Sequence, residues 1–73
     1  MTQAEMLLEK MRSYPPDMPL AQVQAVLVHL GWTLARTRKL HFHYVREGDL
    51  PISIPSHEGY VKPTYLRQIL DRQ

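Results

Sequence analysis

Hydrophobic residues change their spacing at Gly31, and this change rules out an all-α or all-β fold. Before Gly31 they recur every three to four residues, as on one face of a helix, whereas after it they alternate with polar residues, as in a strand. Gly31 suits the left-handed conformation that follows many helices, which would let Trp32 pack back on Leu27. The chain is therefore expected to be an α+β domain.

Three segments have the spacing of amphipathic helices: residues 2–13, residues 18–30 and a last segment that begins at Pro63. Their expected inward faces consist of Ala4, Leu7, Leu8 and Met11, then Leu20, Val23, Val26, Leu27 and Leu30, and finally Tyr65, Leu66, Ile69 and Leu70.

The first two helices also carry start signals. Thr2 and Glu5 have the capping-box spacing. Asp17 is a candidate N-cap for the second helix, and Pro19 fits its first turn.

Three strands are expected at residues 32–35, 40–45 and 50–54, with the first turn near residues 37–39. Pro51 has no N–H to offer a neighbour, which favours an edge position for the third strand. The order α-α-β-β-β-α predicts a three-stranded antiparallel meander with helices on one face. The expected helix-facing residues are Trp32, Leu34, Leu40, Phe42, Tyr44, Leu50, Ile52 and Ile54.

Because strand side chains alternate, the apolar set of the second strand decides where His41 and His43 point. Burying two imidazoles in place of Phe42 and Tyr44 would cost several kcal/mol at about 25 cal/mol per Å² of apolar surface. We therefore expect both histidines on the open face of the sheet, with cations close by. These cations are Arg36, Arg38 and Lys39.

Positive charge is unevenly distributed. The formal net charge of the 73 residues is +2, but residues 1–30 carry −1 and residues 31–73 carry +3. Between Gly31 and Arg46 there are four cations and no acid. A basic stripe with interleaved His and aromatic residues is typical of nucleic-acid binding, although a plain solvated face is the alternative.

Length and composition exclude several classes of protein. A domain of 73 residues has a modest core, so an active site should be an open surface feature suited to a polymer. The absence of Cys excludes disulfides and thiolate metal sites. No apolar run approaches the ~20 residues of a membrane span, and the first residues lack a signal-peptide pattern. We expect a cytoplasmic protein with no membrane partner.

Imidazoles and guanidinium groups on one open face fit metal-independent RNA cleavage. A neutral His can take a proton from a ribose hydroxyl, and Arg or Lys can stabilise the charge that develops on phosphorus. A zinc site built from His41, His43 and His57 is the alternative. We do not favour it, because the cations would repel the ion and no carboxylate has an evident supporting position. No metal and no other cofactor is expected.

The segment from Leu30 to Leu70 resembles the HicA family of toxin ribonucleases from HicA–HicB toxin–antitoxin modules. The shared features are a helix that ends in LGW, an Arg four to five residues on, and a His ten residues after the Gly. A strand FHY, a strand ending in IPSH and a closing helix TYLRQIL follow. With the preceding helix the resemblance covers about the last 55 residues, and its order and spacing carry more weight than any single motif.

The resemblance implies a fold like that of double-stranded-RNA-binding domains, α-β-β-β-α, over residues 18–72 of a single domain 1–73, with residues 2–13 as an additional helix. It implies cleavage of mRNA with His41 as the catalytic residue, and a HicB-like antitoxin as protein partner. The expected RNA-binding residues are Arg36, Arg38, Lys39, His43, Arg46 and Lys62.

Family members usually carry a small pair such as Gly-Ser just before the His, where this chain has Lys39 and Leu40. This departure leaves two alternatives open. One is a non-catalytic RNA- or DNA-binding module on the same fold. The other is a protein-interaction domain whose basic stripe docks an acidic partner.

Overall fold

The computed structural model describes residues 2–73, in which three helices and a three-stranded antiparallel sheet confirm the predicted α+β class. A separate pair of two-residue strands completes the described fold. The elements are α1 (Gln3–Arg12), β1 (Met18–Pro19), α2 (Leu20–His29), β2 (Thr33–Arg38), β3 (His41–Val45), β4 (Ile52–Pro55), β5 (Tyr60–Val61) and α3 (Pro63–Asp71).

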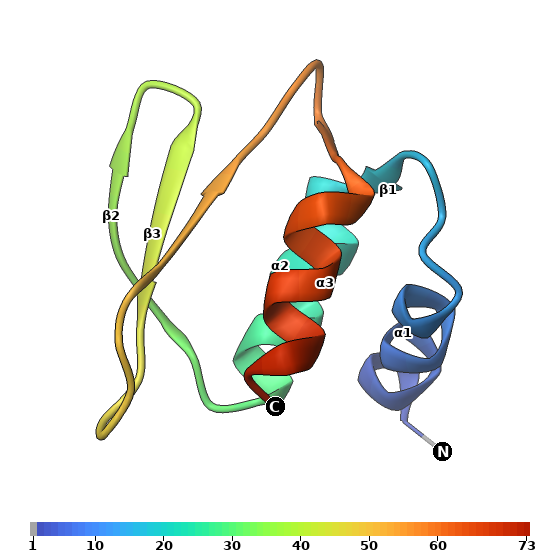
Figure 1. Ribbon diagram of the computed structural model, residues 1–73, viewed down its shortest axis with the longest axis horizontal. Coiled ribbons are helices and arrows are strands. Elements are labelled where there is room, and N and C mark those ends of the chain that lie inside the picture. The colour runs from blue at the N-terminus through green and yellow to red at the C-terminus, as the bar shows by residue number, and fades with distance from the viewer. Residues whose placement is uncertain (1) are drawn as a thin grey trace.

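The helices all lie on one side of the β2-β3-β4 sheet (Figure 1), as predicted. In that view α2 and α3 stand between the sheet and α1, which is the outermost layer. The core contains side chains from every layer: Leu8 and Met11 of α1, Val23, Val26 and Leu27 of α2, Leu66 and Ile69 of α3, and Trp32, Tyr44, Ile52 and Ile54 from the sheet side. None of the described elements covers the opposite face of the sheet.

The predicted signals at the start of α1 and the end of α2 are confirmed. The Thr2 hydroxyl accepts a hydrogen bond from the Glu5 N–H, and the Glu5 carboxylate accepts one from the Thr2 N–H. Gly31 has φ +91°, and the Trp32 N–H donates to the Leu27 carbonyl at 2.9 Å. This bond reverses the chain out of α2 and buries the indole of Trp32 to 2% exposure.

The predicted start of the second helix is wrong. Met18 and Pro19 are extended and form β1, which pairs with β5, so α2 begins at Leu20. Pro19 occupies the N-cap position and makes no side-chain cap, and Asp17 instead forms an ion pair with Lys62. The capping preference of Asp17 was outweighed by the pairing of β1 with β5, a strand about 40 residues away. No local sequence pattern predicts this pairing.

Three residues that were predicted to face the helices are exposed. Leu34, on the edge strand β2, is 43% exposed although it lies opposite the buried Tyr44. Leu40 is 59% exposed because it lies in the two-residue turn between β2 and β3, and Leu50 is 77% exposed because it lies in the loop before β4. Phe42, Tyr44, Ile52 and Ile54 do face the helices. The sheet order leaves β4 with β3 as its one neighbour, which confirms the edge position that Pro51 predicted.

In the described part of the chain, no helix has both the length and the apolar character needed to cross a membrane.

Candidate nucleic-acid interface

Two rungs of directly opposed residues cross the open face of the sheet. In one, His41 of β3 lies opposite Arg38 of β2 and Pro55 of β4; in the other, His43 lies opposite Arg36 and Ser53. Residues directly opposite one another in an antiparallel pair point to the same face. Phe42 and Tyr44 pack on the core side, so both rungs point away from the helices. We call Arg36, Arg38, His41, His43 and Ser53 the outer-face cluster.

A β-bulge brings the two arginines into this cluster. Pairing shifts register between Leu34 and Arg36, so Leu34 opposes Tyr44 whereas Arg36 opposes His43. In an unbroken register Arg36 would lie opposite Phe42, on the helix-facing side. The extra residue, Ala35, therefore reverses the direction of the side chains that follow it. Sequence reasoning predicted the cations near the histidines but did not find the bulge that aligns them.

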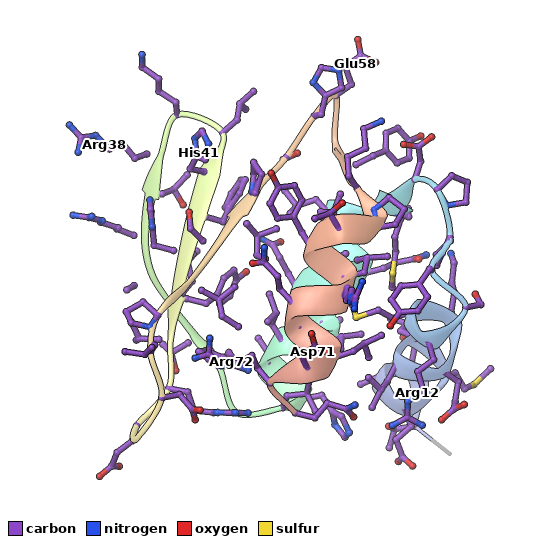
Figure 2. The ribbon with its side chains drawn as sticks, in the orientation of Figure 1. Arg12, Arg38, His41, Glu58, Asp71 and Arg72 are labelled. Atoms are coloured by element: carbon purple, nitrogen blue, oxygen red, sulfur yellow. The ribbon has the colours of Figure 1, made fainter. Side chains whose placement is uncertain are left out.

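The cluster is open and positively charged. His41, Arg36 and Arg38 are exposed and His43 is half-buried. Figure 2 shows Arg38 projecting from the sheet on the side away from the helices, with His41 at the hairpin end of β3. The directly opposed positions of the two rungs hold no carboxylate. Among residues 2–73, neither imidazole forms a hydrogen bond with another protein group, so both can bind a ligand.

The turn before His41 is strained. Arg38 and His41 pair across the two-residue turn Lys39–Leu40, and Lys39 has φ +56°. Turns of this length favour Gly at the first position because a side chain there is strained at positive φ. The turn is also tied to the end of β4, because the Ser56 N–H donates to the Leu40 carbonyl at 2.8 Å.

Lys39→Gly is therefore expected to stabilise the domain by about 0.5–1 kcal/mol. Relief of a left-handed side chain gains about 1–2 kcal/mol, and the added freedom of Gly in the unfolded chain offsets about 0.5–1 kcal/mol of it. Equilibrium unfolding in urea measures the difference. Thr37→Gly in the neighbouring strand is the control and should destabilise. A loss of stability in both variants would show that the turn is not strained.

Arg46, which was expected to bind RNA, lies outside the outer-face cluster and is held inside the protein. Its guanidinium donates to the Leu30 carbonyl at 2.8 Å and to the Arg72 carbonyl at 2.5 Å. These carbonyls belong to the C-cap residues of α2 and α3. The guanidinium also stacks 4.4 Å from the centre of the Trp32 ring. Arg46 thus joins the end of β3 to two helix C-termini, where a cation is favoured.

Asp49 completes this arrangement from the loop between β3 and β4. Its carboxylate accepts a hydrogen bond from Nε of Arg46 at 2.8 Å and lies 4.0 Å from Arg72. The Arg46 hydrogen bond, helped by the charges of Arg46 and Arg72 and opposed by burial, holds the pKa of Asp49 below its ordinary value of 3.8.

Asp49→Asn is expected to be less stable than the parent at pH 7, with the gap closing in acid. A lowered pKa stabilises the folded state while the carboxylate is charged, and the stabilisation is lost as pH falls from 3.8 through the folded value. Urea unfolding between pH 7 and pH 3 measures the gap, and Glu47→Gln controls for the same change of charge. A gap that stays constant with pH would contradict the assignment.

The remaining candidate residues lie elsewhere. Lys62, at the N-cap of α3, pairs with Asp17 at 3.4 Å, and both side chains are about half exposed. His57 is exposed and pairs with Tyr60 across the turn before β5. Within residues 2–73, no group of three His, Cys, Asp or Glu side chains could hold a metal ion.

Ser53, which lies opposite His43, is the one member of the outer-face cluster that the sequence analysis did not name. The available signal was its place two residues after Pro51 on the same strand, because residues two apart on a strand point to the same face.

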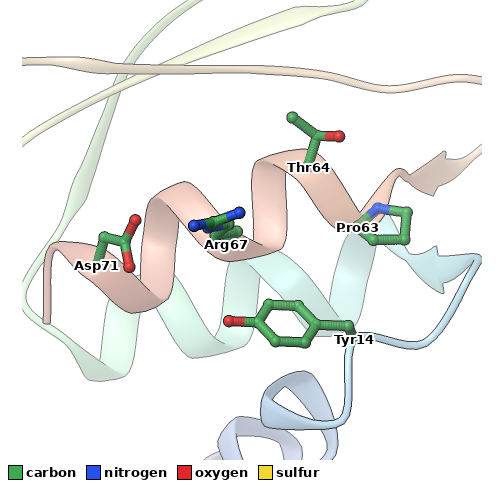
Figure 3. Close-up of a pocket in the computed structure, with 5 residues that line it drawn as sticks. All are labelled: Tyr14, Pro63, Thr64, Arg67 and Asp71. Atoms are coloured by element: carbon green, nitrogen blue, oxygen red, sulfur yellow. The ribbon is translucent and has the colours of Figure 1, made fainter.

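An open pocket of about 480 Å³ lies along α3 (Figure 3), lined by Tyr14, Pro63, Thr64, Arg67 and Asp71. It shares no residue with the outer-face cluster. Its lining combines one cation, one anion and two hydroxyl groups, so its charge favours neither an anionic nor a cationic ligand.

Comparison with known proteins gives no match to a family model, to a curated protein or to a solved structure.

Proposed function

We propose that the chain is a HicA-like toxin, a metal-independent endoribonuclease that cleaves mRNA on the open face of its sheet. The observation that carries this proposal is the rung in which exposed His41 stands directly opposite Arg38. The proposal treats residues 18–72 as a core like that of double-stranded-RNA-binding domains and His41 as the catalytic residue.

The chemistry needs few groups because RNA carries its own nucleophile. His41 acts as general base or acid in attack of the ribose 2′-hydroxyl on the adjacent phosphate. Arg36, Arg38 and Lys39 bind phosphates, and a guanidinium beside the reacting phosphorus stabilises the charge of the transition state. His43 completes the binding surface. Arg46 is omitted, because its donors are already bound to Asp49 and to the carbonyls of Leu30 and Arg72.

The uncovered, cationic outer face is also the surface on which we propose that a HicB-like antitoxin binds. An acidic partner bound there would bury the outer-face cluster and exclude RNA. A single protein–protein interface would therefore inhibit RNA cleavage.

RNA cleavage in the presence of EDTA tests the proposal. Purified protein should cut single-stranded RNA and leave 2′,3′-cyclic phosphate ends, because the 2′-oxygen is the nucleophile. An RNA with 2′-O-methyl groups is the control and should remain intact. Loss of all cleavage in EDTA, restored by a divalent cation, would contradict a metal-independent mechanism.

A binding module without catalysis is the second candidate, and Lys39–Leu40 favours it. The exposed Leu40 adjoins His41 in the chain, at a position where the HicA family usually has a small residue. Three phosphate contacts, from Arg36, Arg38 and Lys39, predict that log affinity for single strands falls with log salt at a slope near −2, and Lys39→Gly should reduce the slope by about 0.7. Binding with this slope but without cleavage would select the module over the nuclease.

A further inference from the structure

The outer-face cluster contains two histidine–arginine rungs, and the proposed function gives a catalytic role to the histidine of only one. His41 opposes Arg38, and His43 opposes Arg36 with Ser53 on its other side. The two imidazoles are two residues apart on one strand and point the same way. At a rise of about 3.3–3.4 Å per residue, their backbone positions are separated by about 6.6–6.8 Å.

We infer that His43 is a second catalytic residue, which acts with His41 as an acid–base pair on one phosphate. This inference rests on the proposed function and extends it. In-line displacement at phosphorus places the entering and leaving oxygens on opposite sides, so base and acid must approach from opposite sides as well. Each needs to come within about 2.6–3.2 Å of its oxygen. Two imidazoles this far apart can flank one phosphoryl group.

The step balances without any further reactant. One imidazole takes the 2′-hydroxyl proton as that oxygen bonds to phosphorus. The other, protonated, gives its proton to the 5′-oxygen as the bond between that oxygen and phosphorus breaks. The products are a 2′,3′-cyclic phosphate and a free 5′-hydroxyl, and exchange with solvent restores the two protonation states.

The groups around the pair suit an anionic substrate. Those that oppose the imidazoles are Arg36 and Arg38 on β2 and the neutral Ser53 and Pro55 on β4. The two arginines can bind the non-bridging oxygens of the phosphate while the imidazoles act on its entering and leaving oxygens.

A leaving-group substitution separates this role from simple binding. We would compare His41→Ala and His43→Ala on RNA and on a ribonucleoside 3′-(4-nitrophenyl phosphate), whose leaving group departs without a proton. On RNA, both variants should lose about 10²–10⁴-fold in kcat/KM. On the aryl ester, the variant that lacks the general acid should recover to within about tenfold of the parent, and the variant that lacks the general base should not. His29→Ala, an exposed histidine at the end of α2, is the matched control.

Recovery of one variant alone supports the pair and tells which ring is the acid. If both variants recover on the aryl ester, if neither does, or if His43→Ala loses nothing on RNA, the pair is overturned while the nuclease stands. If the parent protein cuts neither substrate, the proposed function itself fails, so the two failures are distinguishable.

Discussion

His41→Ala should reduce RNA cleavage by about 10²–10⁴-fold, the usual contribution of a positioned general base or acid. The imidazole is exposed at the start of β3, opposite Arg38, and makes no hydrogen bond within the described chain. Removing it therefore takes away the proposed proton-transfer group and leaves the sheet and the core in place.

The measurement is the rate of RNA cleavage in EDTA by matched amounts of the parent, His41→Ala and His29→Ala. Thermal unfolding of each protein accompanies it, and all three midpoints should agree, because surface substitutions usually change stability by less than about 0.5 kcal/mol. Equal cleavage by the parent and His41→Ala would remove His41 from the mechanism. Equal loss in both variants would show that the loss is not specific to the His41 imidazole.

Arg46→Ala should reduce stability more than any other substitution of a cation in the chain, by about 3 kcal/mol. It removes charge-assisted hydrogen bonds to the carbonyls of two helix C-caps, each worth about 1.5–3 kcal/mol before relaxation, together with the hydrogen bond to Asp49. It also removes a stacked cation over Trp32, worth about 0.5–2 kcal/mol. Because neighbours relax and water reaches the freed carbonyls, the net loss is smaller than the sum.

Thermal unfolding should show this loss as a fall in Tm of about 12–24 °C. Arg46→Lys should recover part of it, since an ammonium keeps the charge but cannot bond to three groups in one plane. Arg36→Ala is the matched control, because it deletes the same side chain from the outer-face cluster. It should weaken RNA binding and leave Tm nearly unchanged. Similar Tm values for Arg36→Ala and Arg46→Ala would contradict the separate roles.

The sequence predicted the elements of the fold well where the signal was local. The capping box at Thr2, the helix stop at Gly31 and the alternation of Phe42 and Tyr44 each depend on residues close together in the chain. Alternation does not mark where a strand ends, so Leu40 and Leu50 were assigned to the core although both lie in turns or loops. The pairing of β1 with β5 was missed because it joins distant segments.

The basic residues of the candidate site also show that local sequence does not predict tertiary partners. Arg36, Arg38 and Arg46 are the same residue type and lie within eleven residues of the chain. The first two reach the open face because of a bulge at Ala35, whereas Arg46 bonds to carbonyls 16 and 26 residues away. Tertiary partners alone separate a cation available to a ligand from one that holds the protein together.

NMR of the histidine side chains during titration with single-stranded RNA tests most directly where nucleic acid binds. A 2′-O-methyl RNA in EDTA keeps the strand intact and leaves its phosphates unchanged. We expect the ring resonances of His41 and His43 to shift together and to saturate at one RNA concentration, while that of His29 does not move. Shifts at His29 alone, or no shift at any of these rings at low salt, would contradict an RNA-binding outer face.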